Sequence, residues 1–410
     1  MVFVTDGLLR KSVAVCQSLG RRGIDVTVGS STRLSPAFFS RYCRDRVVYP
    51  SPQQAPDAFV DALLDALRTN PHDVLMPTDD AALAAISRHR DDVERVTHVP
   101  VPDPDVLAYG LDKAKGTRLA EAAGVPQPPT AYPRDAAEAA RLAAEMGGSV
   151  VVKPRAMSGG RGIVHVEPGE DVAAAWRQVQ ATDPEPLLQR RIPDGPRYDV
   201  CLLMDRRGRL VASFVQKELR HFPLRDGMST LQESVWRPDL IERAAALLRI
   251  LRWYGLAEVE FMEDPTTGEA YFLEINPRFW ASIQLAVSCG VDFPHLLYRV
   301  AVGDDVPEVH SYPVGRRCRW LLPGDILHFV ANQDRWRMRP SFWQFGGAPT
   351  VYDGIYPDDP GATLGVLLSC GHYLFDRDLW GLLARRDRSA PQLQPQPAPA
   401  VLPTPLRTAA

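Results

Sequence analysis

Two runs decide the fold of this chain: EVEFMED at residues 258–264 and FLEINPRFW at residues 272–280. Side chains of a strand alternate between its two faces, so each run places two polar side chains on one face. These four are Glu258, Glu260, Glu274 and Asn276. A turn at residues 264–268 would pair the runs and bring together carboxylates and an amide oxygen, the hard ligands that magnesium prefers. An ordinary hairpin with solvent-facing acids is the alternative, although burying unpaired carboxylates among phenylalanines would be costly.

A glycine-rich loop occurs earlier in the chain, within VVVKPRAMSGGRG at residues 150–162. Lys153 ends a β-branched run that leads into this loop. The loop residues of interest are Ser158, Gly159, Gly160 and Gly162. Glycines let backbone N–H groups point into one concave space and the lysine adds full charge, a combination that suits phosphate oxygens. The pattern is not a Walker A loop, because GxxxxGK[ST] is absent, and a hairpin turn with an exposed Lys153 is the alternative.

The N-terminal part of the chain alternates between short apolar runs and Ala/Leu-rich helical patterns. This alternation predicts a parallel sheet flanked by helices. A nicotinamide-binding domain would need GxGxxG after the first run, and TDGLLRKS offers only Gly7, so dinucleotide binding is not expected. A proline-rich connection after Gly124 indicates a domain boundary, and the region that follows, up to Val302, has a mixed α+β pattern. Residues 306–385 are rich in Trp and Pro and suggest no known unit.

The composition excludes several classes of protein. With 50 acidic and 47 basic side chains, the formal charge of −3 offers no field for gripping a nucleic-acid backbone. The six cysteines form no CxxC pair and are expected to be reduced thiols. The N-terminus reaches Asp6 too soon for a signal peptide, and no apolar run is long enough to span a bilayer, so a cytoplasmic protein is expected. Only five of the cations are lysines, namely Lys11, Lys113, Lys115, Lys153 and Lys217.

The glycine loop and the two acidic runs, in this order, resemble the ATP-grasp superfamily. Within it the chain is similar to the carboxylate-amine ligases, whose ATP-binding half is akin to those of carbamoyl-phosphate synthetase and biotin carboxylase. The resemblance implies an α/β and α+β architecture, in which a Rossmann-like pre-ATP-grasp domain precedes a two-lobed ATP-grasp fold. The implied ranges are 1–108 for the first domain, 109–305 for the second with its lid at about 125–188, 306–388 for a C-terminal region of unknown fold and 389–410 for a disordered proline-rich tail.

The resemblance also implies which residues bind the nucleotide. Lys113, in LDKAKGTRLAEAAG, and Lys153 would hold the α- and β-phosphates, and backbone amides of residues 158–162 would close over the β- and γ-phosphates. The adenine hinge LLQRRI departs from the family pattern, because many relatives carry an acidic residue near the adenine and ribose. The residues expected to serve there are Gln189, Arg190, Ile192 and Asp199. Solvated edge charges are the alternative for the two hinge arginines.

The implied metal ligands are Glu260, Glu274 and Asn276. They would hold one or two magnesium ions, with manganese as an alternative. Arg278 would face the transferred phosphoryl group and the substrate carboxylate, where a bidentate fork fits. Lys217 and Arg220 stand where relatives often place a basic pair toward the substrate, and a surface position is the alternative for both. Four other polar residues are expected to be solvated or structural: Lys11, Lys115, His165 and His221.

The activity that the resemblance implies is ATP-dependent formation of an amide or peptide bond, through an acyl phosphate and with release of ADP and phosphate. Bicarbonate activation, as in carboxylases and carbamoyl-phosphate synthesis, is one alternative, and a non-catalytic ATP-binding module is another. The expected partners are small carboxylate and amine substrates, with no nucleic acid and no membrane span, and a homodimer is left open. The sequence does not predict which acid and which amine are joined.

Overall fold

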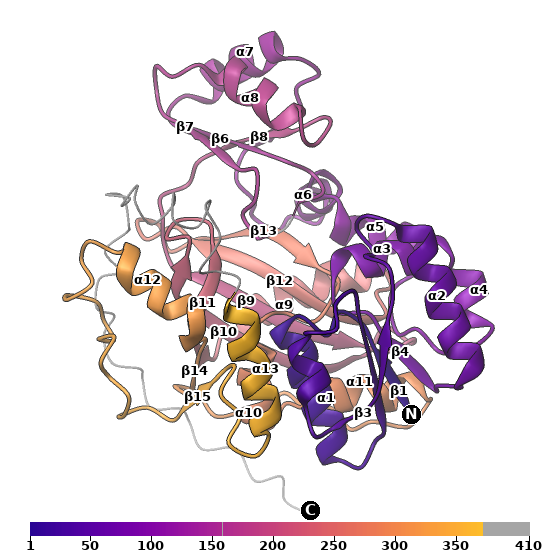
Figure 1. Cartoon of the computed structure of the whole chain (residues 1–410). Coiled ribbons are helices and arrows are strands. Elements are labelled where there is room, and N and C mark those ends of the chain that lie inside the picture. The colour runs from indigo at the N-terminus through magenta and orange to yellow at the C-terminus, as the bar shows by residue number, and fades with distance from the viewer. Residues whose placement is uncertain (158, 372–410) are drawn as a thin grey trace, which may run out of the picture.

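The computed structural model describes residues 1–157 and 159–371. These residues form three sheets, shown with their helices in Figure 1. The tail predicted to be disordered, residues 389–410, lies outside the described residues, and so does Ser158 of the glycine loop. None of the helices in the described ranges is long and apolar enough to cross a membrane.

The N-terminal unit is built on a parallel sheet with the strand order β3-β2-β1-β4. Its strands are β1 (Val2–Val4), β2 (Val26–Ser30), β3 (Cys43–Val48) and β4 (Val74–Met76). Its helical segments are α1 (Arg10–Arg21), η1 (Pro36–Phe39), α2 (Pro56–Thr69), α3 (Asp80–Arg88) and α4 (Arg90–Glu94). All residues of β1, β2 and β4 are buried, as in parallel sheets that are covered on both faces. The parallel sheet that the alternating pattern predicts is therefore present.

A small antiparallel sheet with the order β5-β8-β6-β7 forms a separate unit, called the lid below. It follows helices α5 (Pro104–Leu111) and α6 (Lys113–Ala122). The lid consists of β5 (Thr130–Ala131), α7 (Ala136–Met146), β6 (Val150–Lys153), β7 (Val164–Val166), α8 (Val172–Gln180) and β8 (Leu187–Arg190). Its two helices pack on one another and enclose a small core of its own with Val152, Trp176 and Leu188. In Figure 1 the lid stands at the top, above the body of the molecule.

The largest sheet has seven strands in the order β13-β12-β9-β10-β11-β14-β15. Its strands are β9 (Arg197–Met204), β10 (Leu210–Phe222), β11 (Met228–Val235), β12 (Gly255–Glu263), β13 (Ala270–Asn276), β14 (Arg317–Arg319) and β15 (Thr350–Tyr352). The helical segments around it are α9 (Pro238–Ile250), α10 (Ile283–Ser288), α11 (Phe293–Ala301), η2 (Leu321–Asp325), α12 (Ile326–Ala331) and α13 (Pro360–Cys370). Strands β12 and β13 form the antiparallel hairpin that the two acidic runs predict.

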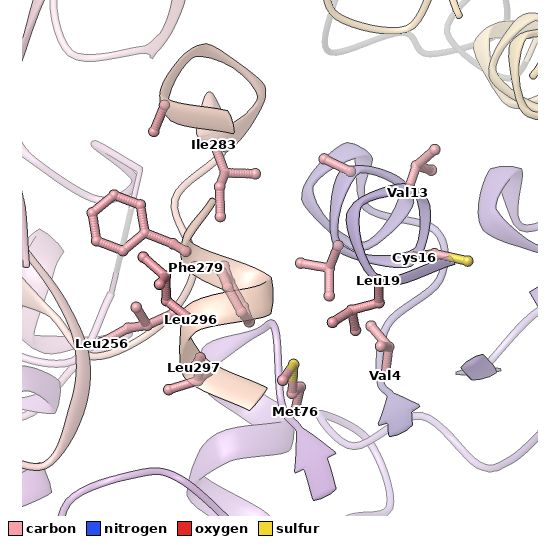
Figure 2. Packing of buried hydrophobic residues seen from close by; sticks show 14 of the residues in the cluster. Val4, Val13, Cys16, Leu19, Met76, Leu256, Phe279, Ile283, Leu296 and Leu297 are labelled. Carbon is pink, nitrogen blue, oxygen red and sulfur yellow. The ribbon is translucent and has the colours of Figure 1, made fainter. Parts of the chain in front are cut away.

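The N-terminal unit and the large sheet share one hydrophobic core. Figure 2 shows part of it, including Leu19 of α1, Leu256 of β12, Ile283 of α10 and Leu297 of α11. Protein interiors are close-packed, so a common core resists movement of one unit against the other. Helix α1 is thereby held beside α10 and α11, the helices that follow the hairpin β12–β13.

Residues 306–371, for which the sequence suggests no known unit, join the two larger units. Strand β14 pairs with β11, and β15 pairs with β14, so this region completes the large sheet. Helix α13 packs on η1, where a Cβ at Gly365 would lie only 2.7 Å from the Cα of Pro36. Asp359, directly before α13, is buried and accepts a hydrogen bond of 2.9 Å from Gln17 of α1. The end of the described chain is therefore anchored on the N-terminal unit.

Candidate active site

A cleft of about 650 Å³ lies where the N-terminal unit, the lid and the large sheet meet. We call one set of its lining residues the acidic part: Lys113, Lys153, Glu258, Glu260, Glu274, Asn276 and Arg278. We call a second set the apolar part: Leu8, Leu9, Pro36, Trp320, Leu322 and Val366. The acidic part contains the candidate phosphate lysines, the candidate metal ligands and Arg278, whereas no part of the sequence pattern singles out the apolar one.

The hairpin β12–β13 positions the acidic side chains by its register. Glu260 is the direct cross-strand partner of Glu274, and Glu258 is the partner of Asn276. The Nδ2 atom of Asn276 donates to Glu258 at 3.2 Å, to Glu260 at 2.8 Å and more weakly to Glu274 at 3.4 Å. The convergence expected from side-chain alternation is therefore present, and Glu258 belongs to the same cluster.

The charges of this cluster are not balanced by the hairpin itself. Burial, and then the neighbouring Glu260, raise the pKa of Glu258 well above its ordinary value. Burial and the adjacent Glu274 do the same for Glu260. Glu274 differs: burial opposes its ionisation, but Lys113, Lys153 and Arg278 hold its pKa below the ordinary value. Crowded carboxylates that resist ionisation are a donor set that a divalent cation would satisfy. In the described part of the chain, no group of three or more His, Cys, Asp or Glu side chains is arranged to hold a metal ion by itself.

Two lysines from different elements meet this cluster. Lys113 opens α6, where Asp112 caps the helix, and its Nζ lies 2.6 Å from Glu274 Oε2 and 2.5 Å from the carbonyl oxygen of Met157. Lys153 ends the lid strand β6, and burial lowers its pKa to about 8 although Glu274 works in the opposite direction. Both ammonium groups thus converge on one carboxylate, next to the start of the glycine loop.

The glycine loop closes the cleft from the lid side. Gly159, Gly160 and Gly162 have φ values of +68°, +72° and +74°, which only glycine adopts without strain. Gly159 and Gly160 line the cleft, and a Cβ on Gly160 would lie 1.8 Å from the backbone oxygen of Asp226. Asp226 stands between β10 and β11, so the loop lies directly against the large sheet.

Arg278 connects the acidic part with the N-terminal unit. Its Nε donates to Asp80 Oδ1 at 2.7 Å, and its Nη2 donates to Asn276 Oδ1 at 3.3 Å. Asp80 begins α3, directly after the loop that follows β4. The guanidinium is therefore held at the junction of the two units and lines the cleft.

This arrangement agrees with the comparison against protein-family models. Residues 112–309 match the model described as the ATP-binding domain of the carbamoyl-phosphate synthase L chain. These residues form an ATP-grasp domain. The resemblance inferred from the glycine loop and the acidic hairpin is thus confirmed.

Individual relatives agree with the assignment of this domain. The C-terminal section of the carbamoyl phosphate synthase large chain of Methanopyrus kandleri is 25% identical over 226 residues, which are 53% of this chain and 42% of the relative. The chain thus spans less than half of that relative. A biotin carboxylase domain of the Hydrogenobacter thermophilus 2-oxoglutarate carboxylase, solved with magnesium ADP, ADP and bicarbonate, has a TM-score of 0.65 and 19% identity. It covers 77% of this chain and 73% of its own.

A third similar structure is the ADP complex of N5-carboxyaminoimidazole ribonucleotide synthetase. It has a TM-score of 0.61 and 16% identity, and the match covers 75% of this chain and 78% of that one. At these identities the two structures show that the ATP-grasp fold is shared. By their names, the three relatives are a synthase, a carboxylase and a synthetase.

Three of the four residues expected at the adenine hinge line the cleft there, and the fourth, Asp199, belongs to the acidic cluster. Gln189 and Ile192 are buried and line the cleft, and Gln189 Nε2 donates to Thr130 Oγ1 at 2.9 Å. Arg190 lines the cleft with an exposed side chain. Asp199 lies elsewhere, because β9 pairs it with Glu260 of the acidic hairpin. Burial, and then Glu218 and Glu258, raise the pKa of Asp199 well above its ordinary value, so it extends the acidic cluster.

The structure corrects the placement of Lys217 and Arg220. On β10, Glu218 faces the cleft, and side-chain alternation turns Lys217 to the opposite face, 6.0 Å from the ring centre of Tyr198. A β-bulge between Glu218 and Arg220 then changes the register. Arg220 is buried and pairs with Asp325 at 2.7 Å, so it is neither a surface residue nor part of the cleft lining in the described chain.

Two residues that the sequence analysis expected to be solvated or structural, and one that it did not consider, lie in the cleft. Lys11, expected to be solvated, is 6% exposed and lines it. His165 also lines it, and its Nε2 lies 2.7 Å from Asp226 Oδ2, which connects the lid to the large sheet. Glu218 lines it too, and it is hydrogen-bonded to His221, whose structural role was expected. One signal could have indicated Lys11, because it closely follows the carboxyl end of the first strand of a parallel sheet, where ligands commonly bind.

Proposed function

We propose that the protein is an ATP-dependent ligase that joins a carboxylic acid to an amine through an acyl phosphate. The observation that carries the proposal is the position of Arg278, which contacts Asn276 in the acidic part and Asp80 in the N-terminal unit. A guanidinium at this junction is placed to hold a transferred phosphoryl group and a carboxylate side by side. The substrate carboxylate would therefore lie between the nucleotide and the N-terminal unit.

The reaction needs no protein nucleophile. A carboxylate oxygen attacks the γ-phosphorus of ATP, the bond to the β,γ-bridging oxygen breaks, and ADP leaves. The nitrogen of the neutral amine then attacks the acyl carbon, the carbon–oxygen bond to phosphate breaks, and the nitrogen gives up one proton to the departing phosphate or to solvent. Positioning and electrostatic stabilisation carry most of the acceleration in phosphoryl transfer. Lys113 and Lys153 would neutralise phosphate charge, since both converge on the acidic part.

Magnesium fits the acidic part, because its carboxylates are crowded and resist ionisation. Glu260, Glu274 and Asn276 would hold the ion, which supplies positive charge for the phosphate oxygens of the nucleotide. The lid loop would exclude water from the acyl phosphate, since Gly160 packs directly on Asp226. The hinge residues Gln189 and Ile192 would border the adenine.

The test is an ADP-release screen over pairs of carboxylic acids and amines, with the products identified by mass spectrometry. We expect ADP release that depends on both an acid and an amine, together with an amide product. Release of AMP and pyrophosphate would contradict the proposal. Glu274→Gln should lower turnover about 100-fold or more, because it removes the carboxylate on which both lysines converge. Glu242→Gln, on the exposed side of α9, is the matched control and should leave turnover unchanged.

ATP-dependent carboxylation is a second candidate, because two of the similar structures are a biotin carboxylase domain with bound bicarbonate and N5-carboxyaminoimidazole ribonucleotide synthetase. In that reaction bicarbonate takes the place of the carboxylic acid. ADP release that bicarbonate stimulates in the presence of an amine, with no other acid required, would favour carboxylation over ligation of an organic acid.

A further inference from the structure

The segments that follow the carboxyl ends of β1 and β4 line the cleft. The chain runs from β1 outward to β2 and β3 and then returns to the other side of β1 as β4, so β1 and β4 flank a topological switch point. In open α/β sheets, ligands bind in the crevice outside the carboxyl ends of strands at such a point. The loops that follow these two strands lead to Lys11 and Asp79, and both residues line the cleft.

Within the described chain, Lys11 has one long ion pair and no closer anionic partner. Its side chain is almost fully buried, and within the described chain its Nζ makes no hydrogen bond. The nearest carboxylate oxygen in that part of the chain, Asp79 Oδ1, is 3.9 Å away. Burial, and then the positive charge of Arg278, lower its pKa to about 8. Lys11 also lies in the first turn of α1, a wholly described helix with no acidic residue in that turn and no side-chain cap. The helix dipole and the ammonium therefore both favour a negative group here.

Asp79 supplies the opposite charge beside Lys11. Its side chain is 44% exposed and faces the cleft, whereas that of Lys11 is buried. The neighbouring Asp80 is engaged by Arg278. The two charges thus lie 3.9 Å apart on the wall of the cleft, where they can face the carboxylate and the ammonium group of one ligand.

The apolar part of the cleft continues from Lys11. Leu8 and Leu9 directly precede α1, and Trp320, Leu322 and Val366 come from the C-terminal region. These walls are held in place. The guanidinium of Arg10 lies 4.1 Å from the ring centre of Trp320 and pairs with buried Asp353 at 3.0 Å. The charge of Arg10 is therefore already neutralised, and the surface beyond Lys11 suits an apolar group.

We propose that this subsite binds the amine substrate as an α-amino acid with an apolar side chain. Lys11 binds the α-carboxylate, Asp79 orients the amino group, and the apolar part of the cleft receives the side chain. The reacting nitrogen then lies on the side of Arg278, where the acyl phosphate forms. This inference rests on the proposed ligase function and names the class of its amine substrate.

The experiment compares amines with and without the carboxylate. L-leucine is paired with 3-methylbutylamine, and L-phenylalanine with 2-phenylethylamine, using the best acid from the screen. In the unmodified protein, kcat/KM should be roughly 10- to 100-fold higher for the amino acids, the ratio expected for a charge-assisted hydrogen bond. Glycine and L-aspartate should be poor substrates. Equal kcat/KM for leucine and 3-methylbutylamine would overturn the proposal and leave the ligase function intact.

The decisive variant is Lys11→Met, with Lys115→Met as the matched control, because Lys115 is exposed on α6. Lys11→Met should lower kcat/KM for leucine roughly 10- to 100-fold and change that for 3-methylbutylamine by less than about threefold. An equal loss for both amines would indicate a structural role and would overturn the proposal. Lys115→Met should change neither value.

If no pair of acid and amine releases ADP, the proposed ligase function is wrong, but the subsite is still untouched by that result. A binding measurement then tests the subsite by itself. Calorimetric titration of L-leucine into the ADP-loaded protein should give heat with the unmodified chain and with Lys115→Met. The heat should be lost with Lys11→Met, and ADP should bind all three proteins equally. Absence of leucine binding to the unmodified protein would overturn the subsite.

Discussion

The acidic part and the apolar part of the cleft are assembled in opposite ways. The four polar side chains of the hairpin come from one pair of neighbouring strands, and cross-strand register brings them together. The apolar part draws on segments far apart in the chain, from Leu8 to Val366. Val366 belongs to the core that the N-terminal unit and the large sheet share. Substitutions in the first region should therefore affect turnover more than stability. Substitutions that break the contacts holding the apolar part in place should lower the free energy of unfolding more than they lower turnover.

Asp325→Ala should have the largest effect, because it releases the C-terminal region from the large sheet. Asp325 is fully buried and lies 2.7 Å from Arg220 and 2.6 Å from Arg319. Its removal leaves two buried guanidinium groups without their carboxylate, which costs about 3–5 kcal/mol. Urea unfolding should show this loss in the free energy of unfolding.

Asp304→Ala is the control for that comparison, because Asp304 pairs with Arg299 at 2.9 Å on the surface. Exposed pairs contribute about 0–1 kcal/mol, so its unfolding midpoint should barely change. Similar losses for both variants would mean that the buried pair does not anchor the region.

Gly160→Ala should have the next largest effect, and it should appear in turnover. Gly160 combines a φ of +72° with a Cβ position 1.8 Å from Asp226 O, so alanine forces the lid loop away from the large sheet. A displacement of about 1 Å near reacting groups lowers the rate about 100-fold. ADP release at saturating ATP measures the loss.

Gly208→Ala separates strain from collision. Gly208 has a similar φ of +74°, but a Cβ there would meet nothing within 4 Å. Gly208→Ala should lose about 1–2 kcal/mol of unfolding free energy from backbone strain, as Gly160→Ala does, but its turnover should be unchanged. Equal turnover in the two variants would show that the contact with Asp226 is not needed for catalysis.

The same contrast explains what the sequence could predict. Glu260, Glu274 and Asn276 are close in sequence, and alternation alone assigns them to one face of a hairpin. The prediction that Lys217 faces the substrate was wrong, because β10 lies in the middle of the large sheet and is buried along most of its length. Alternation alone therefore does not reveal which face of β10 meets the cleft. Glu218, next to Lys217, faces the cleft instead.

The apolar part could not be predicted because it depends on long-range packing. Strands β14 and β15 have three residues each, too few for a periodic pattern, and they exist because β11 offers a free edge. Lys11 was assigned to solvent from its place in the first helix of the N-terminal domain. Only the crossover of β4 to the other side of β1 places the first turn of that helix in the cleft. Local motifs report the residues that bind charge, whereas the remaining walls follow from topology.

Lys153→Arg tests whether the acidic part requires a compact cation. Arginine keeps the charge but not the shape, so ADP affinity should fall about tenfold.

The pH dependence of ADP binding should also change in Lys153→Arg. The pKa of Lys153 is lowered to about 8 from 10.5, so the unfolded chain binds more protons between these values, and this group adds stability as pH rises through that window. Nucleotide binding needs the protonated form and should weaken above pH 8, whereas the arginine variant should bind weakly but evenly up to about pH 9.5. Calorimetry with ADP and magnesium measures both curves.

His165→Ala should have the smallest effect, because it removes one contact between the lid and the body. His165 Nε2 lies 2.7 Å from Asp226 Oδ2. Burial raises the pKa of Asp226, but His165 and Arg197 lower it further, so the pKa stays below its ordinary value. One such hydrogen bond contributes about 1 kcal/mol, so KM for ATP should rise about fivefold with kcat nearly unchanged. His165→Gln offers a similar donor and should restore KM. His89→Ala, which breaks a comparable but exposed contact of 3.3 Å to Asp57, is the control. If KM is unchanged in His165→Ala while Gly160→Ala is impaired, packing of the loop alone closes the lid.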